Sequence, residues 1–231
     1  MAFQGYTQQT VDFMWGIRFN NERGWFLEHK DDYINTFLTP TRELGEQVYD
    51  AVHALLPDEP LMLKVSRIYR DARRLFGRGP YKDHLWWCIR TGDKDWTGRP
   101  TFWFELGPDY YSFGLGFWSP AAALMETYRK QIDAHPEELS KLVRQFNRQS
   151  VFTLDGPEYA RSKGQTSDLL RPWYQKKSLS LRWEGPLDER IFTSALAEDI
   201  IDGFKTLIPF YHYFNKLVSL TPRQERRGEE A

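Results

Sequence analysis

The chain has 231 residues, with 31 basic and 32 acidic side chains, 16% aromatic residues and one cysteine, Cys88. The single cysteine excludes an internal disulfide, and no apolar run approaches the ~20 residues that a membrane-spanning helix needs. We therefore expect one domain over residues 1–231, cytoplasmic and without a membrane segment, with a frayed charged tail at 221–231.

The first sixty residues are predicted to be helical. A short helix is expected over 10–18. A longer helix follows from residue 22, because large side chains recur there at three- and four-residue spacing: Trp25, Phe26, His29, Tyr33 and Phe37. His29 is interpreted as a hydrogen-bonded core histidine. A third helix is expected to start at Pro40 and to end before Pro57.

Alternating apolar and polar side chains then predict a sheet. Residues 61–69 are expected to be extended or mixed, and residues with alternating faces follow over 85–90, 101–106 and 110–117. Short turns between the last three strands favour an antiparallel meander, because parallel pairs need long crossovers. The expected fold class is α+β, with an antiparallel sheet of about four to six strands. Helices are expected to pack on it from the N-terminal, middle and C-terminal parts.

A glycine-containing strand leads into the next predicted helix. Ser119 suits the N-cap and Pro120 the first helical position, so we expect a helix from there to residue 132. The free backbone N–H groups at such a helix start can hold an anion. Another helix is expected from Pro136.

The last third of the chain is expected to be mixed. Residues 151–174 look irregular, and 176–184 alternate as a strand with one packed face. One or two helices are expected over 187–220, broken at Pro209.

A basic stretch from Lys64 to His84 is the strongest functional signal. Asp71 is an acid near the middle of this stretch, which holds seven cations: Lys64, Arg67, Arg70, Arg73, Arg74, Arg78 and Lys82. Guanidinium groups suit phosphates and carboxylates, and clustered arginines repel one another unless anions lie among them. The cluster therefore either binds a ligand or pairs with acids elsewhere in the fold, and both readings stay open.

The end of this stretch predicts a shaped loop. Gly77 and Gly79 permit unusual backbone angles, and Pro80 restricts the residue before it. Such a loop would fix the positions of Tyr81 and Lys82. An ordinary turn between two strands is the alternative explanation for the two glycines and the proline.

The stretch resembles the signature of the domain of unknown function 2461 family, a mainly bacterial group. The matching residues are Arg67, Arg70, Asp71, Pro80, Tyr81 and Lys82, with flanking matches at Asn20, Asn21, Trp25, Phe26, Gly116 and Arg129. The chain departs from the pattern at 162–164, where it has Ser-Lys-Gly in place of Pro-Lys-Gly, and it lacks the histidine of an Asp-His-Pro motif. The resemblance implies a soluble α+β domain and no mechanism.

Nine residues are candidates for ligand binding: Arg67, Arg70, Asp71, Tyr81, Lys82, Gly116, Ser119, Arg129 and Lys177. The sequence has no metal-ligand spacing, phosphate-binding loop, dinucleotide fingerprint or nucleophile elbow. We therefore predict no metal and no cofactor. Cys88, in the middle of a strand, is interpreted as a small core residue.

Three functions are compatible with these patterns. The preferred one is binding of, or action on, an anionic small molecule bearing phosphate or carboxylate, in an Arg, Lys and aromatic pocket. The second is a structural or interaction role, in which the Arg-Asp-Tyr-Lys set stabilises the fold. The third, single-stranded nucleic-acid binding, is disfavoured by the near-neutral charge. Catalysis and oligomeric state are left undecided.

Overall fold

The fold is built on one antiparallel sheet of six strands, and its class is α+β, as predicted. The computed structural model describes residues 2–222, apart from the side chain of Arg74. The strands pair in the order β1-β2-β3-β4-β6-β5, so the first four form the predicted meander. Their bounds are β1 Leu61–Val65, β2 Leu85–Thr91, β3 Pro100–Leu106, β4 Tyr110–Phe117, β5 Thr153–Asp155 and β6 Ser180–Pro186.

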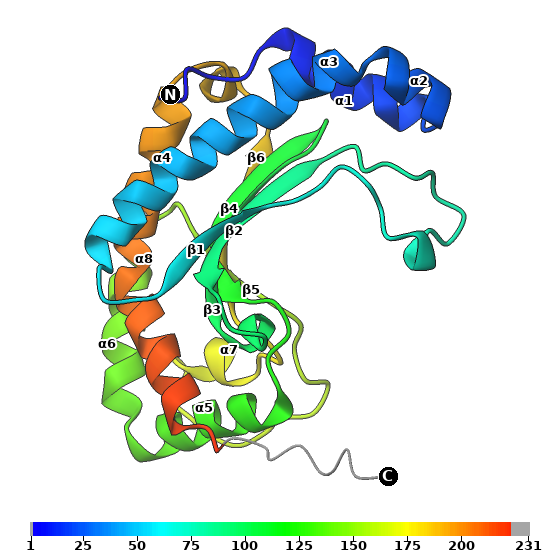
Figure 1. Ribbon diagram of the computed structural model, residues 1–231. Helices are drawn as coiled ribbons and strands as arrows, with labels where there is room; N and C mark the ends of the chain where they lie inside the picture. Colours follow the sequence, from blue (N-terminus) through cyan, green and yellow to red (C-terminus); the bar gives the residue numbers. More distant parts are fainter. Residues whose placement is uncertain (1, 223–231) are drawn as a thin grey trace.

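One face of the sheet is buried beneath two long helices, α4 (Thr39–Leu55) and α8 (Ala195–Leu220) (Figure 1). α4 packs on β1 and β2, whereas α8 packs on β3 and β4. Alternate strand residues such as Phe104, Leu115 and Leu181 point into this layer and are fully buried. Each buried Leu or Phe contributes roughly 1.5–3 kcal/mol to stability. The opposite face of the sheet lies on the concave side of the molecule.

The N-terminal helices differ from the prediction at one point. The chain forms α1 (Gln8–Phe19), α2 (Arg23–Glu28) and α3 (Lys30–Asp32), and then a π-helix, η1 (Tyr33–Leu38), that continues directly into α4. α4 thus begins at Thr39, with Pro40 in its first turn as predicted, but no loop separates it from η1. The wider π-helical turn adjusts the hydrogen-bond ladder next to the proline, which has no N–H to donate.

The predicted start of the middle helix is also wrong. α5 runs over Ala122–Ala134 with Ala121 as its N-cap, two residues after the predicted cap at Ser119. The N–H of Ser119 donates to the carbonyl of Thr97 at 2.8 Å, so this residue belongs to the preceding loop. α6 (Pro136–Phe146) begins at Pro136 as expected.

Two further corrections concern the last third of the chain. The segment expected to be irregular contains β5 and the short helix α7 (Arg171–Tyr174). α8 continues through Pro209. The proline removes one backbone donor, but the buried flanking side chains of Phe204, Leu207 and Phe210 keep the helix on the sheet.

Short 3-10 helices complete the fold: η2 Ala72–Arg74, η3 Trp96–Gly98 and η4 Glu189–Phe192. Within residues 2–222 no helix combines the length and apolarity needed to cross a membrane. The expected frayed tail falls almost entirely on residues 223–231, outside the described part of the chain.

Candidate functional site: an aromatic cleft on the open sheet face

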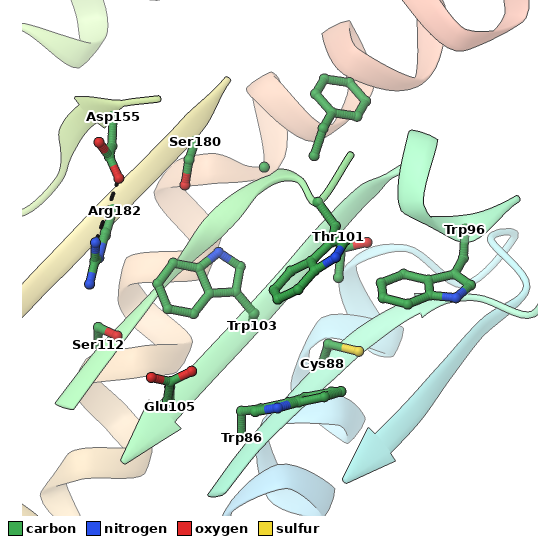
Figure 2. Close-up of a pocket in the computed structure, with 13 residues that line it drawn as sticks. Trp86, Cys88, Trp96, Thr101, Trp103, Glu105, Ser112, Asp155, Ser180 and Arg182 are labelled. Carbon is green, nitrogen blue, oxygen red and sulfur yellow. Dashed lines mark ion pairs between the residues drawn. The ribbon is translucent and has the colours of Figure 1, made fainter. Parts of the chain in front are cut away.

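A cleft of about 410 Å³ lies on the concave face of the sheet, a size typical of small-molecule sites. Trp86 and Cys88 rise from β2, and Thr101 and Trp103 rise from β3 (Figure 2). The other lining residues are Trp96, Glu105, Ser112, Gly116, Phe117, Trp118, Asp155, Ser180 and Arg182. We call these thirteen residues the aromatic cleft.

Strand alternation places the tryptophans on this face. Trp86 and Cys88 are two residues apart on β2 and therefore point to the same side. Trp103 pairs with Cys88 on one side and with Gly114 on the other. Gly114 leaves space beside the indole, and it also allows a close approach to β6, because a Cβ there would collide with the carbonyl oxygen of Leu181.

Cationic side chains lie along the β1–β2 side of the cleft. The ammonium of Lys82 is 5.6 Å from the ring centre of Trp86, and the guanidinium of Arg90 is 4.6 Å from that of Trp96. Cation–π contact stabilises both positions. Neither cation forms an ion pair with a carboxylate among residues 2–222. The cations on this side of the cleft therefore have no ion-pair partner among the described residues, and Glu105 acts on Lys82 from a greater distance.

The pKa of Lys82 reflects that positive surrounding. Burial lowers the pKa first, Arg70 and Arg67 lower it further, and only Glu105 acts in the opposite direction. An anion bound beside Lys82 would act in the same direction as Glu105 and raise the pKa of Lys82.

Carboxylates lie at two places in the cleft: Glu105 on β3, directly opposite Trp86, and Asp155 on β5. Glu105 accepts a hydrogen bond from the hydroxyl of Tyr110. Arg182 contacts Glu184 and, at 3.6 Å, the Asp155 carboxylate (Figure 2). These acids can accept hydrogen bonds from hydroxyl or amine groups of a ligand. Both ends of the cleft therefore carry charges of both signs: Glu105 lies near Lys82, and Arg182 lies beside Asp155.

Cys88 lies on the cleft floor but is not prepared for attack on a substrate. Its side chain is buried, and burial raises the pKa of the thiol to about 11, against the smaller opposing effects of Arg90 and Lys64. The thiolate is the reactive form, so Cys88 is held as a neutral thiol at physiological pH.

Two of the candidate residues, Arg70 and Tyr81, belong to a group of buried contacts around Tyr81. We call this group, Asn21, Phe26, Arg70 and Tyr81, the internal lock. The amide of Asn21 bonds both backbone groups of Tyr81, each at 2.9 Å, and the Arg70 Nε donates to the same carbonyl at 2.8 Å. The Tyr81 ring is buried and stacks on Phe26 at 4.3 Å. Gly79 is required here, because a Cβ would collide with Asn21.

A second network ties this loop to α1. Arg18 bonds the carboxylate of Asp83 at 2.6 Å, and it also contacts Asp109. Arg70 lies 3.9 Å from Asp83. The hydrogen bond from His84 and then that from Arg18 hold the pKa of Asp83 well below its usual range, against the opposing effect of burial.

Four other cations of the basic stretch are exposed: Lys64, Arg67, Arg73 and Arg78. Asp71 accepts two side-chain hydrogen bonds from Arg73, at 3.0 and 2.7 Å, and both residues are exposed. Arg67 is exposed as well, and it acts on Lys82 through its charge. Of the basic stretch, Lys82 is the member that reaches a ring of the aromatic cleft.

The remaining four candidates lie in three places. Gly116 lines the aromatic cleft. Ser119 lies in a separate wide hollow with Asp93, Arg99 and Lys216. Arg129 and Lys177 meet at the ring of Tyr159, 5.2 and 5.5 Å from its centre. The nine residues therefore do not form one site.

Comparison with known families gives one match. Residues 9–213 match the family described as "Conserved hypothetical protein (DUF2461)". This chain belongs to the DUF2461 family. A search of curated proteins found no match. The description of DUF2461 names no activity, so the function has to be argued from the site.

The fold explains several residues that carried the resemblance to DUF2461. Asn21, Phe26 and Arg70 come from two distant segments, yet each of them contacts Tyr81 at the internal lock. In this DUF2461 chain the most recognisable part of the signature thus fixes the loop that ends at Lys82. Its stabilising role follows from hydrogen bonds to a buried residue.

Sequence reasoning missed the tryptophans of the aromatic cleft. The signal was present, because Trp86 and Trp103 lie on the strand faces opposite to the aliphatic ones. Tyr159 had no such signal, since two of its three cationic partners, Arg129 and Lys177, come from other segments. Within residues 2–222 no group of His, Cys, Asp and Glu is arranged to hold a metal ion.

Proposed function

We propose that the aromatic cleft binds a small anionic molecule that also carries a flat ring. The observation that supports this most directly is Lys82, which has no described carboxylate partner and lies over Trp86 at the edge of a 410 Å³ hollow. Trp86 and Trp103 offer ring faces for stacking, and Lys82 and Arg90 offer positive charge.

The two sides of the cleft also suggest the orientation of the ligand. Its phosphate or carboxylate would lie toward Lys82 and Arg90, within the field of Arg67 and Arg70. Its hydroxyl or amine groups would lie toward Asp155. A ligand with a ring between two polar ends, such as a nucleotide or an aromatic amino-acid derivative, fits this description. A cytoplasmic location remains part of this proposal.

The test is calorimetric binding of matched ligands at fixed ionic strength. The panel pairs nucleoside monophosphates with the parent nucleosides, and indole-3-acetate with indole. We expect the anionic member of at least one pair to bind the chain. We also expect about tenfold weaker binding in Lys82→Ala and in Trp103→Ala, since charged hydrogen bonds and stacking are each worth about 1–2 kcal/mol.

Two variants outside the cleft serve as controls. Lys141→Ala removes an exposed lysine on α6, and Trp15→Ala removes a partly exposed tryptophan on α1. Both should leave binding unchanged. Absence of binding across the whole panel, or equal losses in the controls, would contradict the proposal.

Single-stranded nucleic acid is a second candidate, which Trp86 and Trp103 favour because bases stack on exposed sheet aromatics. A ten-nucleotide oligomer that binds far more tightly than any mononucleotide, with strong salt dependence, would support this alternative over the first.

A further inference from the structure

Three cationic side chains surround the ring of Tyr159, outside the aromatic cleft. The nitrogens of Lys163 and Lys177 and the guanidinium carbon of Arg129 lie 4.4, 5.5 and 5.2 Å from the ring centre. Arg129 comes from α5, Lys163 from the segment between β5 and α7, and Lys177 from the approach to β6. We call Tyr159 and these three cations the Tyr159 cluster.

Acids of the described chain do not neutralise this cluster. None of the three cations forms an ion pair with a carboxylate among residues 2–222. Acids on the same segments are engaged by other groups: Glu126 pairs with Lys130 at 2.8 Å, Glu158 pairs with Lys176 at 2.9 Å, and Asp133 accepts from the Tyr174 hydroxyl at 3.1 Å. The cluster therefore keeps three like charges.

The geometry forces those charges together. An aromatic ring has two faces, so at least two of three cations must share a side or lie at its edge. No two of them can be farther apart than the sum of two ring distances, which is comparable to the Debye length of ~10 Å at 0.1 M salt. Their mutual repulsion is therefore only partly screened.

Arg129 gives a second, independent indication of a missing ligand. One guanidinium nitrogen, Nη1, is buried without a hydrogen-bond partner among the described residues. Buried polar groups are nearly always hydrogen-bonded, and leaving a charged donor unpaired is costly. An acceptor placed beside Arg129 would satisfy this donor.

We propose that the Tyr159 cluster is a second anion site, which binds a dianionic phosphate group, either free or carried by a small molecule. Three positive charges suit a dianion better than a single carboxylate. The planar fork of Arg129 matches phosphate oxygens, while Lys163 and Lys177 act as mobile point charges. This site does not depend on the function proposed for the aromatic cleft.

A ligand site and a purely structural cluster predict opposite effects of charge removal. If the cluster stabilises the fold, Lys177→Ala should lower the melting temperature of the ligand-free protein. If it is a ligand site, Lys177→Ala removes a repelling charge, and the ligand-free melting temperature should stay the same or rise. Lys177→Arg keeps the charge and should keep the binding.

The experiment is calorimetric titration of the full chain with inorganic phosphate and with glycerol 3-phosphate, at an ionic strength held constant with chloride. Glycerol 3-phosphate has no ring, so stacking in the cleft does not contribute. We expect saturable binding of at least one ligand, weakened about tenfold or more in Lys163→Ala and Lys177→Ala. Tighter binding of glycerol 3-phosphate would indicate a phosphate carried on a small molecule.

The matched control is Lys130→Ala. Lys130 follows Arg129 on α5 and is exposed, but Glu126 already pairs with it, so phosphate binding should not change. Lys82→Ala and Trp103→Ala should also leave phosphate binding at the cluster intact, which separates this site from the cleft. The proposal is overturned if no saturable binding occurs, or if Lys130→Ala weakens binding as much as Lys177→Ala does.

Discussion

The carboxylate of Asp83 connects the end of the basic stretch to α1 through its ion pair with Arg18. It is bonded by Arg18 at 2.6 Å and by His84 at 3.0 Å, and its side chain is only 18% exposed. Asp71, by comparison, pairs with Arg73 at the surface, where ion pairs contribute about 0–1 kcal/mol. Asp83 and Asp71 lie twelve residues apart in the sequence. The ion pairs of Asp83 contribute more to stability because Asp83 is more deeply buried.

We predict that Asp83→Asn lowers the free energy of unfolding by about 2 kcal/mol at pH 7, as expected for hydrogen bonds to a charged group. The pKa of Asp83 is lowered in the folded state, so its contribution is complete above the unfolded pKa of about 3.9. It is lost as the pH falls toward the folded pKa. Urea unfolding from pH 7 down to pH 3 measures this.

Asp71→Asn is the control for that series and should change stability by less than about 1 kcal/mol at every pH. A difference between wild type and Asp83→Asn that stays constant from pH 7 to pH 3 would show that the charge of Asp83 is not what stabilises the loop.

At the scale of elements, the close approach of β4 and β6 shapes the cleft. Gly114 and Gly116 both face the open side, and a Cβ at either position would strike the backbone of the neighbouring strand. These glycines therefore serve two purposes. They let the strands pair, and they leave the floor beside Trp103 free of side chains.

We predict that Gly114→Ala destabilises the protein by about 2 kcal/mol, because the obstacle is backbone, which cannot move aside as a flexible side chain can. For a chain of this size that corresponds to a fall in melting temperature of roughly 4–8 °C, measurable by calorimetry. Gly98→Ala is the matched control, since a Cβ there meets nothing within 4 Å. Equal effects of the two substitutions would contradict the steric explanation.

At the scale of the whole molecule, one hydrophobic core joins the N-terminal helices, the sheet and α8. Its members extend from Phe3 to Leu217, and they include the strand residues under α4 and α8. A core shared by all parts of the chain supports the single-domain prediction, which stays a prediction until unfolding is measured.

We predict a single cooperative unfolding transition. Far-UV circular dichroism, which reports mainly on the helices, and tryptophan fluorescence, which includes the cleft indoles, should give the same midpoint in guanidinium. Two separated midpoints would mean that the sheet and a group of helices unfold independently, and would overturn the single-domain prediction.

The sequence alone determined the α+β class and the strands β2, β3 and β4 with their two faces, because strand alternation and turn chemistry are local. Tertiary structure decided which strand face stays open, and so made Trp86 and Trp103 cleft residues. It also brought Asn21 to Tyr81 and gathered Arg129 and Lys177 around Tyr159. These contacts join segments up to sixty residues apart, and no local pattern encodes them. Tertiary packing also decided the length of α8. Its packing on the sheet overrides the local tendency of Pro209 to end a helix.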